Sequence, residues 1–366
     1  MKVLLVNNDK GWGGGQEHLK ELSARIAKMG CRPSFLCRSG SPSEEVFRSL
    51  GYPVYSFERS MNGILRMLVS MAMVIRRESF DILLVAREHD LPALVLAWKL
   101  ASPFKKLGKL VVCFHTATSR RLPFLCFADA VVCVSSYVQK ALRAGNHLAA
   151  QRMSILHNGI DSTDELAPEK FSPRRKRRFF QGEGFPLIGM VGAFFKNQLE
   201  LLEVIPLVKR KFPALKLALV GDDSDSGLTG PIREKICFLN IADDVIFTGK
   251  VPHEKLSDIY FDLDLSVSTF RNEGFGLVHL ESLSAGTPVV CYDEGGQLDI
   301  FGGTSTAVVV TGGPEEFAAA IIGLLENDQK RMDMGREGRN LVERRFSLER
   351  MGSDYVTLFR RMHGDS

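Results

Sequence analysis

Short runs of apolar, largely β-branched residues recur along the chain, separated by longer segments whose apolar residues return every three or four positions. The short runs predict buried strands, and the longer segments predict amphipathic helices. The first half contains the predicted strands Val3–Val6, Cys31–Cys37, Asp81–Ala86, Leu110–Phe114 and Ala130–Ser135. The second half contains Leu187–Val191, Lys216–Val220, Val245–Thr248, Leu263–Ser268 and Pro288–Cys291. Alternation of strands and helices predicts an open parallel sheet with right-handed crossovers in each half.

The two series predict two α/β domains. Helical periodicity is clearest in Glu17–Met29, Arg59–Arg77, Pro314–Leu325 and Ser347–Met362. Prolines, glycines and five consecutive basic residues between the two series are typical of a linker. We expect a first domain over 1–165, a linker over 166–184 and a second domain over 185–346. Ligands of such sheets bind beyond the carboxyl ends of the strands, so the cleft between the domains is the expected site.

Composition is ordinary for a chain of this size. The 366 residues are 45% hydrophobic and 25% charged, which fits two globular domains and excludes disorder throughout. The start reaches Asn7 after four apolar residues, and the longest apolar stretches stop well short of ~20 residues. We therefore expect neither a signal peptide nor a spanning helix. Seven cysteines without a C-x-x-C pair favour reduced thiols in a cytoplasm over a disulfide framework or a structural zinc site.

Charge is divided unevenly between the halves. Residues 1–180 hold 28 lysines and arginines against 15 acidic residues, a net charge of +13, and residues 181–366 carry −9. Arg59–Arg77 combines an arginine stripe with an otherwise apolar helix, and Ser119–Phe127 mixes cations with aromatic residues. These features predict that the first domain docks on an anionic membrane surface. The alternative is a helix packed in the core with a solvated arginine edge.

The most informative motif follows the predicted strand that ends at Ser268. Its sequence, from Arg271 to Glu281, is RNEGFGLVHLE, and a helix is expected to begin at about Leu277 and to end at Gly286. A glycine turn at a helix N-terminus is a phosphate site, because amide groups point at the ligand there. Glu273 can reach a polyol beside the phosphates. Glu281 lies ~12 Å further along the helix, where it could accept hydrogen bonds from a ribose.

This segment resembles the E-x7-E motif of glycosyltransferase family 4, and the resemblance extends from about residue 3 to about residue 360. Five further pieces are similar to the family in order and spacing. They are the first-loop glycines Gly13–Gly15 before Gln16 and Glu17, His115, the interdomain signature His157–Asp161, the strand Val245–Gly249 whose following turn borders the base, and Gly295–Gly296. The resemblance implies an α/β chain of GT-B fold, with two Rossmann-like doubly wound domains facing each other across a cleft. It also implies that the C-terminal helix, 347–363, crosses back onto the first domain.

The function that the resemblance implies is retaining transfer of a sugar from a nucleotide-diphosphate sugar to a glycan or lipid-linked acceptor. The setting would be cell-envelope, surface polysaccharide or lipopolysaccharide assembly, in the cytoplasm or peripherally on the inner membrane. By resemblance His115, Glu273 and Lys196 are the catalytic candidates, since His115 holds the sugar, Glu273 binds its hydroxyls and Lys196 neutralises the diphosphate. The other donor-binding candidates are Gly14, Gly15, Gly249, Lys250, Val251, Gly274, Phe275, Gly276, Leu277, Val278 and Glu281. No cofactor, tightly bound metal or nucleic-acid partner is expected.

One departure from the family pattern leaves alternatives open. The family has an arginine before the lysine of the diphosphate loop, whereas this chain reads Gly192-Ala-Phe-Phe-Lys196, with Arg271 as a conceivable substitute. A nucleotide-sugar-binding scaffold without transferase activity is therefore the alternative function. Phosphorolysis would need a pyridoxal-phosphate lysine, for which no site is evident. A nicotinamide enzyme is disfavoured because Gln16 replaces the third glycine of a dinucleotide loop.

Overall fold

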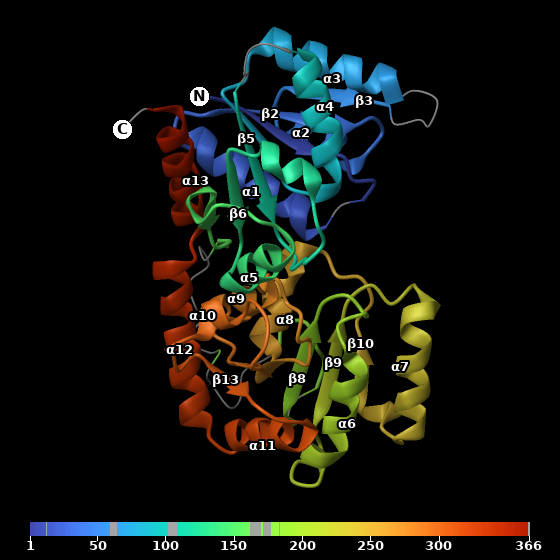
Figure 1. Ribbon diagram of the computed structural model, residues 1–366. Helices are drawn as coiled ribbons and strands as arrows, with labels where there is room; N and C mark the ends of the chain where they lie inside the picture. The colour runs from blue at the N-terminus through green and yellow to red at the C-terminus, as the bar shows by residue number, and fades with distance from the viewer. Residues whose placement is uncertain are drawn as a thin grey trace. The chain divides into compact units, whose positions relative to one another are not determined.

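The computed structural model describes residues 1–11, 13–58, 64–101, 108–161, 170, 177–182 and 184–364 (Figure 1). The chain divides into two compact units. The first unit is Met1–Gly159 together with Leu348–Ser366, and the second is Ile160–Ser347. Most of the predicted linker lies outside the described residues, and the domain boundaries drawn from the sequence stay predictions.

The first unit is built on a parallel sheet with strand order β3-β2-β1-β4-β5-β6-β7. Its strands are β1 (Lys2–Asn7), β2 (Arg32–Arg38), β3 (Val54–Phe57), β4 (Ile82–Val85), β5 (Lys109–Phe114), β6 (Ala130–Cys133) and β7 (Met153–Ile155). Its helices are α1 (Gly14–Lys28), α2 (Pro42–Ser49), α3 (Ile64–Glu78), α4 (Leu91–Ala101), α5 (Ser136–Gly145) and α13 (Leu348–His363). Every residue of the central strand β4 is buried, as expected of a sheet covered on both faces.

Helix α13 belongs to the first unit although it follows the whole second unit in sequence. It lies beside α1 (Figure 1). Gly352 allows the close approach, because a Cβ there would lie 2.6 Å from the Cβ of Arg25. The Arg25 guanidinium also pairs with the Glu349 carboxylate, Nε to Oε1, at 3.1 Å.

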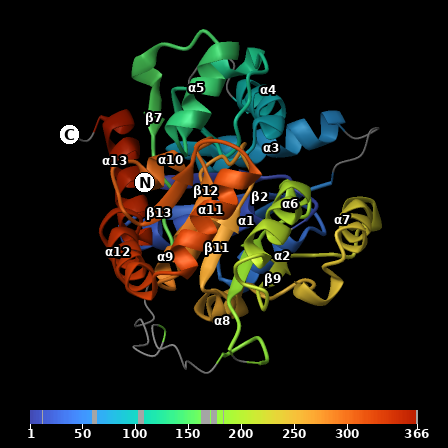
Figure 2. The ribbon, with the colours of Figure 1, turned by 90° about the horizontal axis from the view of Figure 1, so that it is seen from below.

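The second unit contains a parallel sheet with strand order β10-β9-β8-β11-β12-β13. The strands are β8 (Leu187–Val191), β9 (Lys216–Val220), β10 (Val245–Phe247), β11 (Leu265–Ser268), β12 (Val289–Tyr292) and β13 (Ala307–Val310). The helices are α6 (Gln198–Lys209), α7 (Ser226–Phe238), α8 (Leu256–Asp262), α9 (Leu277–Ser284), α10 (Leu298–Phe301), α11 (Pro314–Leu325) and α12 (Asp328–Arg345). One hydrophobic core packs helices α6 and α11 against the sheet, and these two helices lie side by side (Figure 2). A second hydrophobic core packs α8 against the sheet.

The predicted fold class is confirmed: each half forms a doubly wound, parallel α/β unit. Helix α9 begins at Leu277 as expected, and Gly286 just beyond it has a φ of +73°. Helix α1 begins three residues earlier than expected, because the side chain of Gln16 accepts a hydrogen bond from the Gly13 amide and caps the first turn. The predicted helix 59–77 is observed as α3, and its first five predicted residues lie outside the described residues. In the described part of the chain, no helix is both long and apolar enough to span a bilayer.

Candidate functional site

The second unit places two predicted site residues at the point where its strand order reverses. Strand β8 is followed in sequence by β9 on one side, whereas its other neighbour is β11. The loops that leave the carboxyl ends of β8 and β11 diverge at such a point, which is where ligands bind in sheets of this kind. Lys196 is in the loop after β8, and Glu273 is in the loop after β11.

Lys196 and Glu273 form a close ion pair. The Lys196 ammonium donates to Oε2 of Glu273 at 2.6 Å, and both side chains are largely buried. Gly192, at a φ of +142°, leaves room for the lysine stem, because a Cβ there would lie 3.2 Å from Cδ of Lys196. The ammonium also lies 5.4 Å from the centre of the Phe270 ring. The pair therefore joins a cation suited to phosphate with an acceptor suited to sugar hydroxyls.

The turn before α9 requires glycine at Gly276. That residue has a φ of +103°, and a Cβ on it would lie 2.5 Å from Cδ2 of His279. The first amides of a helix have no partner within the helix, so those of Leu277 and Val278 lie at its positive end. The side chain of Phe275 is buried and its ring lies 5.8 Å from that of Phe346, so only the backbone of Phe275 is suited to the predicted donor contact.

The glycine turn Gly295–Gly296 contacts the backbone of the loop that contains Glu273. The amide of Gly296 donates to the carbonyl of Glu273 at 2.7 Å. Gly295 has a φ of +92°, and a Cβ there would lie 2.9 Å from the carbonyl oxygen of Arg271. The two segments therefore form one structure, and the backbone position of Glu273 depends on glycines more than twenty residues away.

Glu281 and Val251 both adjoin the core that contains Tyr260. The Tyr260 hydroxyl donates to Oε2 of Glu281 at 3.0 Å, and Tyr260 is fully buried. Burial and the nearby Glu281 carboxylate raise the pKa of the Tyr260 phenol well above its usual value, so this hydroxyl stays a donor. Gly249 follows the edge strand β10 at a φ of +67°, and a Cβ there would lie 3.6 Å from Oδ1 of Asp223. Lys250 is exposed, and Val251 packs against the core that contains α8.

Arg271 is engaged by neighbouring side chains. Its guanidinium pairs with Glu200 at 2.9 Å and with Glu294 at 2.8 Å, and lies 3.5 Å from the centre of the Tyr292 ring. A diphosphate could recruit this cation only by displacing carboxylates. The structure therefore gives little support to Arg271 as a substitute for the family's arginine.

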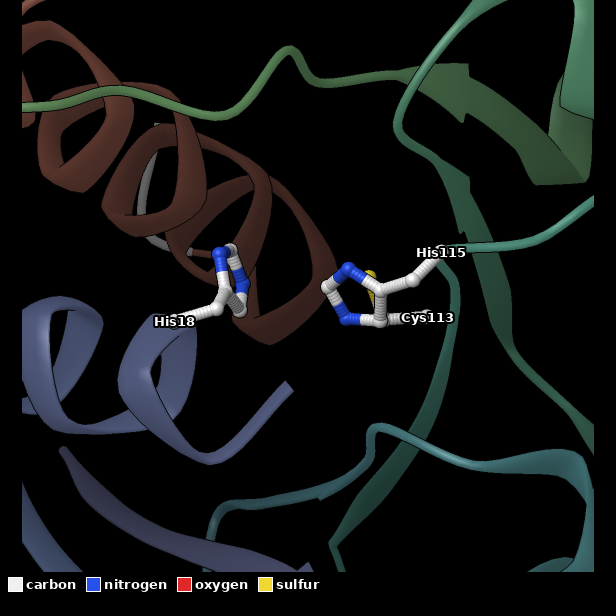
Figure 3. A group of neighbouring side chains, drawn as sticks. All are labelled: His18, Cys113 and His115. Atoms are coloured by element: carbon white, nitrogen blue, oxygen red, sulfur yellow. The ribbon is translucent and has the colours of Figure 1, made fainter. Parts of the chain in front are cut away.

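The first unit holds the remaining predicted residues. His115 follows β5, and its ring lies 4.6 Å from that of His18 on α1, centre to centre (Figure 3). Burial lowers the pKa of His115 to about 4, so this imidazole is neutral at physiological pH. Gly14 and Gly15 form the first turn of α1, where a Cβ would meet nothing within 4 Å. His18 was missed by sequence reasoning, because nothing in the pattern connects residues so far apart.

His279 gives a prediction about pH. It is fully buried, and neither ring nitrogen has a hydrogen-bond partner among the described residues. Burial lowers its pKa from 6.5 to about 4, with Glu273 opposing and Lys196 adding to the shift. Between about pH 6.5 and pH 4 this ring therefore binds more protons in the unfolded chain than in the folded chain. The free energy of unfolding consequently falls as the pH drops through this range. The loss should reach about 3 kcal/mol for this ring, and equilibrium unfolding at several pH values measures it.

The matched comparison uses two leucine variants. His279→Leu should flatten the pH dependence by that amount, whereas His253→Leu, which changes an exposed ring, should leave it as in the parent protein. An unchanged slope in folded His279→Leu would show that this ring does not carry the effect.

Comparison with known proteins places both units in one family. A family model described as glycosyl transferases group 1 matches residues 173–341, and one described as Glycosyltransferase Family 4 matches residues 12–164. The sulfoquinovosyl transferase SQD2 of Arabidopsis thaliana is 30% identical over 222 residues, covering 59% of this chain and 42% of that protein. A GDP-mannose-dependent alpha-(1-6)-phosphatidylinositol monomannoside mannosyltransferase of Mycolicibacterium smegmatis is 28% identical over 227 residues, covering 58% and 57%.

Solved structures extend the likeness to the full chain. A glycosyltransferase from Rickettsia africae superposes with a TM-score of 0.83 at 18% sequence identity, covering 100% of this chain and 99% of that one. This likeness establishes the two-unit GT-B fold. The chain spans about half the length of the curated relatives that it matches.

Proposed function

Because the chain belongs to glycosyltransferase family 4, we propose that it moves a sugar from a nucleotide-diphosphate sugar to a glycan or lipid-linked acceptor with retention of configuration. The observation that carries the proposal is the Lys196–Glu273 pair at the strand-order reversal, beside the N-terminus of α9. A cation and a helix N-terminus suit a diphosphate, and a carboxylate suits sugar hydroxyls. The name of the mycobacterial relative includes a nucleotide-sugar donor and a lipid acceptor, which supports the same class.

The chemistry asks mainly for stabilisation of the leaving group. Negative charge accumulates on the diphosphate as the bond from the anomeric carbon to the phosphate oxygen breaks. The Lys196 ammonium and the first amides of α9 would stabilise that charge. Lys196 would have to shift from Glu273 toward the diphosphate, and the sugar hydroxyls would take its place on that carboxylate. Family membership suggests that the leaving phosphate takes the proton of the acceptor hydroxyl, so the chain need not supply a nucleophile. His115 would hold the sugar as a neutral imidazole, and Glu281 would bind the ribose.

Two assays test this proposal in sequence. A thermal-shift panel of uridine, guanosine and adenosine diphosphate sugars should identify the donor, because a bound ligand raises the melting temperature by mass action. Transfer of radiolabelled sugar from that donor to glycan or lipid-linked acceptors should then be detected. Absence of binding to every nucleotide sugar would overturn the proposal.

A non-catalytic binding scaffold is the second candidate. It is favoured by the single cation of loop 192–198 and by the two carboxylates that engage Arg271. Donor binding without transfer to any acceptor would support the scaffold.

Glu281 provides a direct test of donor recognition. Glu281→Ala should weaken donor binding by about 1–3 kcal/mol, roughly 5- to 150-fold in dissociation constant, because it removes charge-assisted hydrogen bonds. Isothermal titration measures the change. Glu234→Ala, on the exposed face of α7, is the control and should bind donor as the parent does. Unchanged affinity in folded Glu281→Ala would remove this residue from the ribose site.

We also propose that the first unit docks on an anionic membrane. Large apolar side chains are exposed on the adjacent helices α3 and α4 and in the following segment 123–127. We call them the α3–α4 apolar patch: Ile64, Leu65, Val69, Met73, Leu96, Leu100 and Phe127. Leu65 is 72% exposed and Met73 is 60% exposed, so α3 is not simply a core helix.

Basic residues accompany the patch. Arg66 and Arg77 lie along one edge of the exposed stripe of α3 by helical periodicity. The Lys99 ammonium lies 5.1 Å from the centre of the Phe127 ring. Arg120 and Arg121 are exposed as well. Peripheral membrane proteins usually bind by inserting apolar side chains into the bilayer interface. Each basic residue near an anionic surface adds about 1 kcal/mol of attraction. Three further basic residues near this part of the chain, Arg59, Lys105 and Lys106, lie outside the described residues.

Vesicle co-sedimentation tests membrane docking. The protein should sediment with vesicles that contain anionic lipid and should be released as the salt concentration rises. A Leu65→Ser, Met73→Ser double variant should sediment several-fold less. The control is Phe238→Ser, which removes an even more exposed apolar side chain from the second unit. Failure of the parent protein to sediment at low salt would leave a soluble acceptor as the better proposal.

A further inference from the structure

His18, Cys113 and His115 lie together in the first unit, outside the donor-binding residues of the second. Their nearest ligand atoms, one from each side chain, all lie within 4.8 Å of one another. Cys113 is on β5 and His115 follows two positions later, a spacing that places both side chains on one face of an extended chain. His18 approaches from α1, so the cluster joins two elements of the fold (Figure 3).

Two of these side chains have unsatisfied nitrogen atoms. Nε2 of His18 and Nε2 of His115 are both buried and have no hydrogen-bond partner in the described part of the structure. His18 as a whole is only 5% exposed. Buried polar atoms of native proteins are nearly always paired, and an orphaned pair calls for an explanation such as an ion. Burial and the neighbouring His115 lower the pKa of His18 well below 6.5, so both rings are neutral, which is the form that binds metals.

We propose that His18, Cys113 and His115 bind Zn²⁺ or a similarly thiophilic divalent ion, and that the bound ion prevents His115 from holding a sugar. Two imidazoles and one thiolate form a donor set typical of zinc, and three protein ligands leave a fourth position for water. Tetrahedral zinc needs ligand atoms about 3.4–3.7 Å apart, so small side-chain rotations must draw the group together. His115 is partly exposed, which gives the ion a route of entry.

Metal binding would release one proton from Cys113. The Cys113 thiol contacts the Tyr355 hydroxyl at 3.2 Å, and burial raises its pKa to about 12, so the thiol is protonated without metal. The metal–sulfur bond forms as the S–H bond breaks and the proton passes to solvent. The Tyr355 hydroxyl can then donate to the thiolate. Occupancy should therefore rise with pH, because proton release accompanies binding.

Cobalt absorption tests the site without donor or acceptor, so the result does not depend on the proposed function. Co²⁺ added to the purified protein should give an intense near-ultraviolet thiolate-to-cobalt band that saturates at one equivalent, and Zn²⁺ should abolish it. Cys113→Ser should lose the band. Cys37→Ser makes the same change at another fully buried strand cysteine of this unit, and it should keep the band.

A second variant guards against misfolding of the first. His18→Asn should keep the fold, judged by circular dichroism, and should weaken cobalt binding at least about tenfold. No band in the folded parent protein with excess cobalt, or an unchanged band in Cys113→Ser, would overturn the site.

The second claim, that the bound ion prevents His115 from holding a sugar, rests on the proposed function. One equivalent of Zn²⁺ should suppress sugar transfer by the parent protein, a chelator should restore it, and Cys113→Ser should be insensitive. Cobalt binding without zinc inhibition would keep the site and overturn the block of His115. If no transfer is detected under any condition, the cobalt spectrum still decides whether the site exists.

Discussion

Replacing Lys196 by methionine is expected to lower kcat for sugar transfer roughly 100- to 1000-fold, the usual consequence of removing one preorganised charge from a developing anion. The methionine retains the length of the stem that Gly192 accommodates and removes only the ammonium. Since the loop lacks the family's arginine and Arg271 is held by two carboxylates, no other cation of this loop is placed to compensate. Single-turnover measurements with saturating donor isolate the chemical step.

Two further variants serve as controls for the Lys196→Met result. Lys196→Arg retains the charge and should recover part of the rate, although its planar fork does not reproduce a point charge. Lys211→Met removes an exposed lysine that pairs with Glu326, so it should leave kcat within about twofold of the parent. A kcat unchanged in folded Lys196→Met would show that the diphosphate is stabilised elsewhere.

Replacing Tyr355 by alanine is expected to lower the free energy of unfolding of the first unit by about 3–5 kcal/mol, the range for deleting a large buried aromatic side chain. Tyr355 is fully buried, its hydroxyl meets Cys113, and its ring lies 6.0 Å from that of Phe359. Such a loss is a large part of the stability of a typical domain. The variant therefore measures how far the first unit depends on α13.

The protein carries its own probe for this measurement. Trp98 is on α4 of the first unit, and the chain's other tryptophan, at position 12, falls within the residue range of the same unit. Tryptophan fluorescence during denaturant titration therefore reports on that unit. Arg360→Ala, on the exposed face of the same helix, should shift the midpoint little. Coincident transitions for Tyr355→Ala and the parent protein would mean that α13 contributes little to the first unit's stability.

The sequence predicted the parts of the fold whose signals are local. The central strands are continuous apolar runs, and the start of α9 follows from the glycine turn before Leu277. Strands β3 and β13 were missed because they are short, partly exposed edge strands with weak patterning. Helix α12 was missed because few of its residues are apolar, and it packs through Gly338, where a Cβ would lie 2.7 Å from Leu283. Helical periodicity of apolar residues does not detect a contact made by glycine.

The site was predicted residue by residue, but its pairings were not. Lys196 and Glu273 were each named from motifs, whereas their contact joins positions 77 residues apart and depends on the order of the strands. The partners that engage Arg271 come from the start of α6 and from the turn after β12, so composition alone could not assign them. The neighbours of His115 were unpredictable for the same reason. Local patterns identify the residue types, and topology determines which of them meet.

The division of the first unit along the chain has a consequence for biosynthesis. A ribosome that translates at about 5–20 residues per second needs roughly 10–40 s to pass from Gly159 to Leu348. Throughout that interval the surface of α1 that later receives α13 has no cover from this chain, whereas the second unit is continuous and can complete its fold as it emerges. We therefore expect nascent chains stalled before Leu348 to be bound by chaperones through the first unit, and chains released after α13 to escape them.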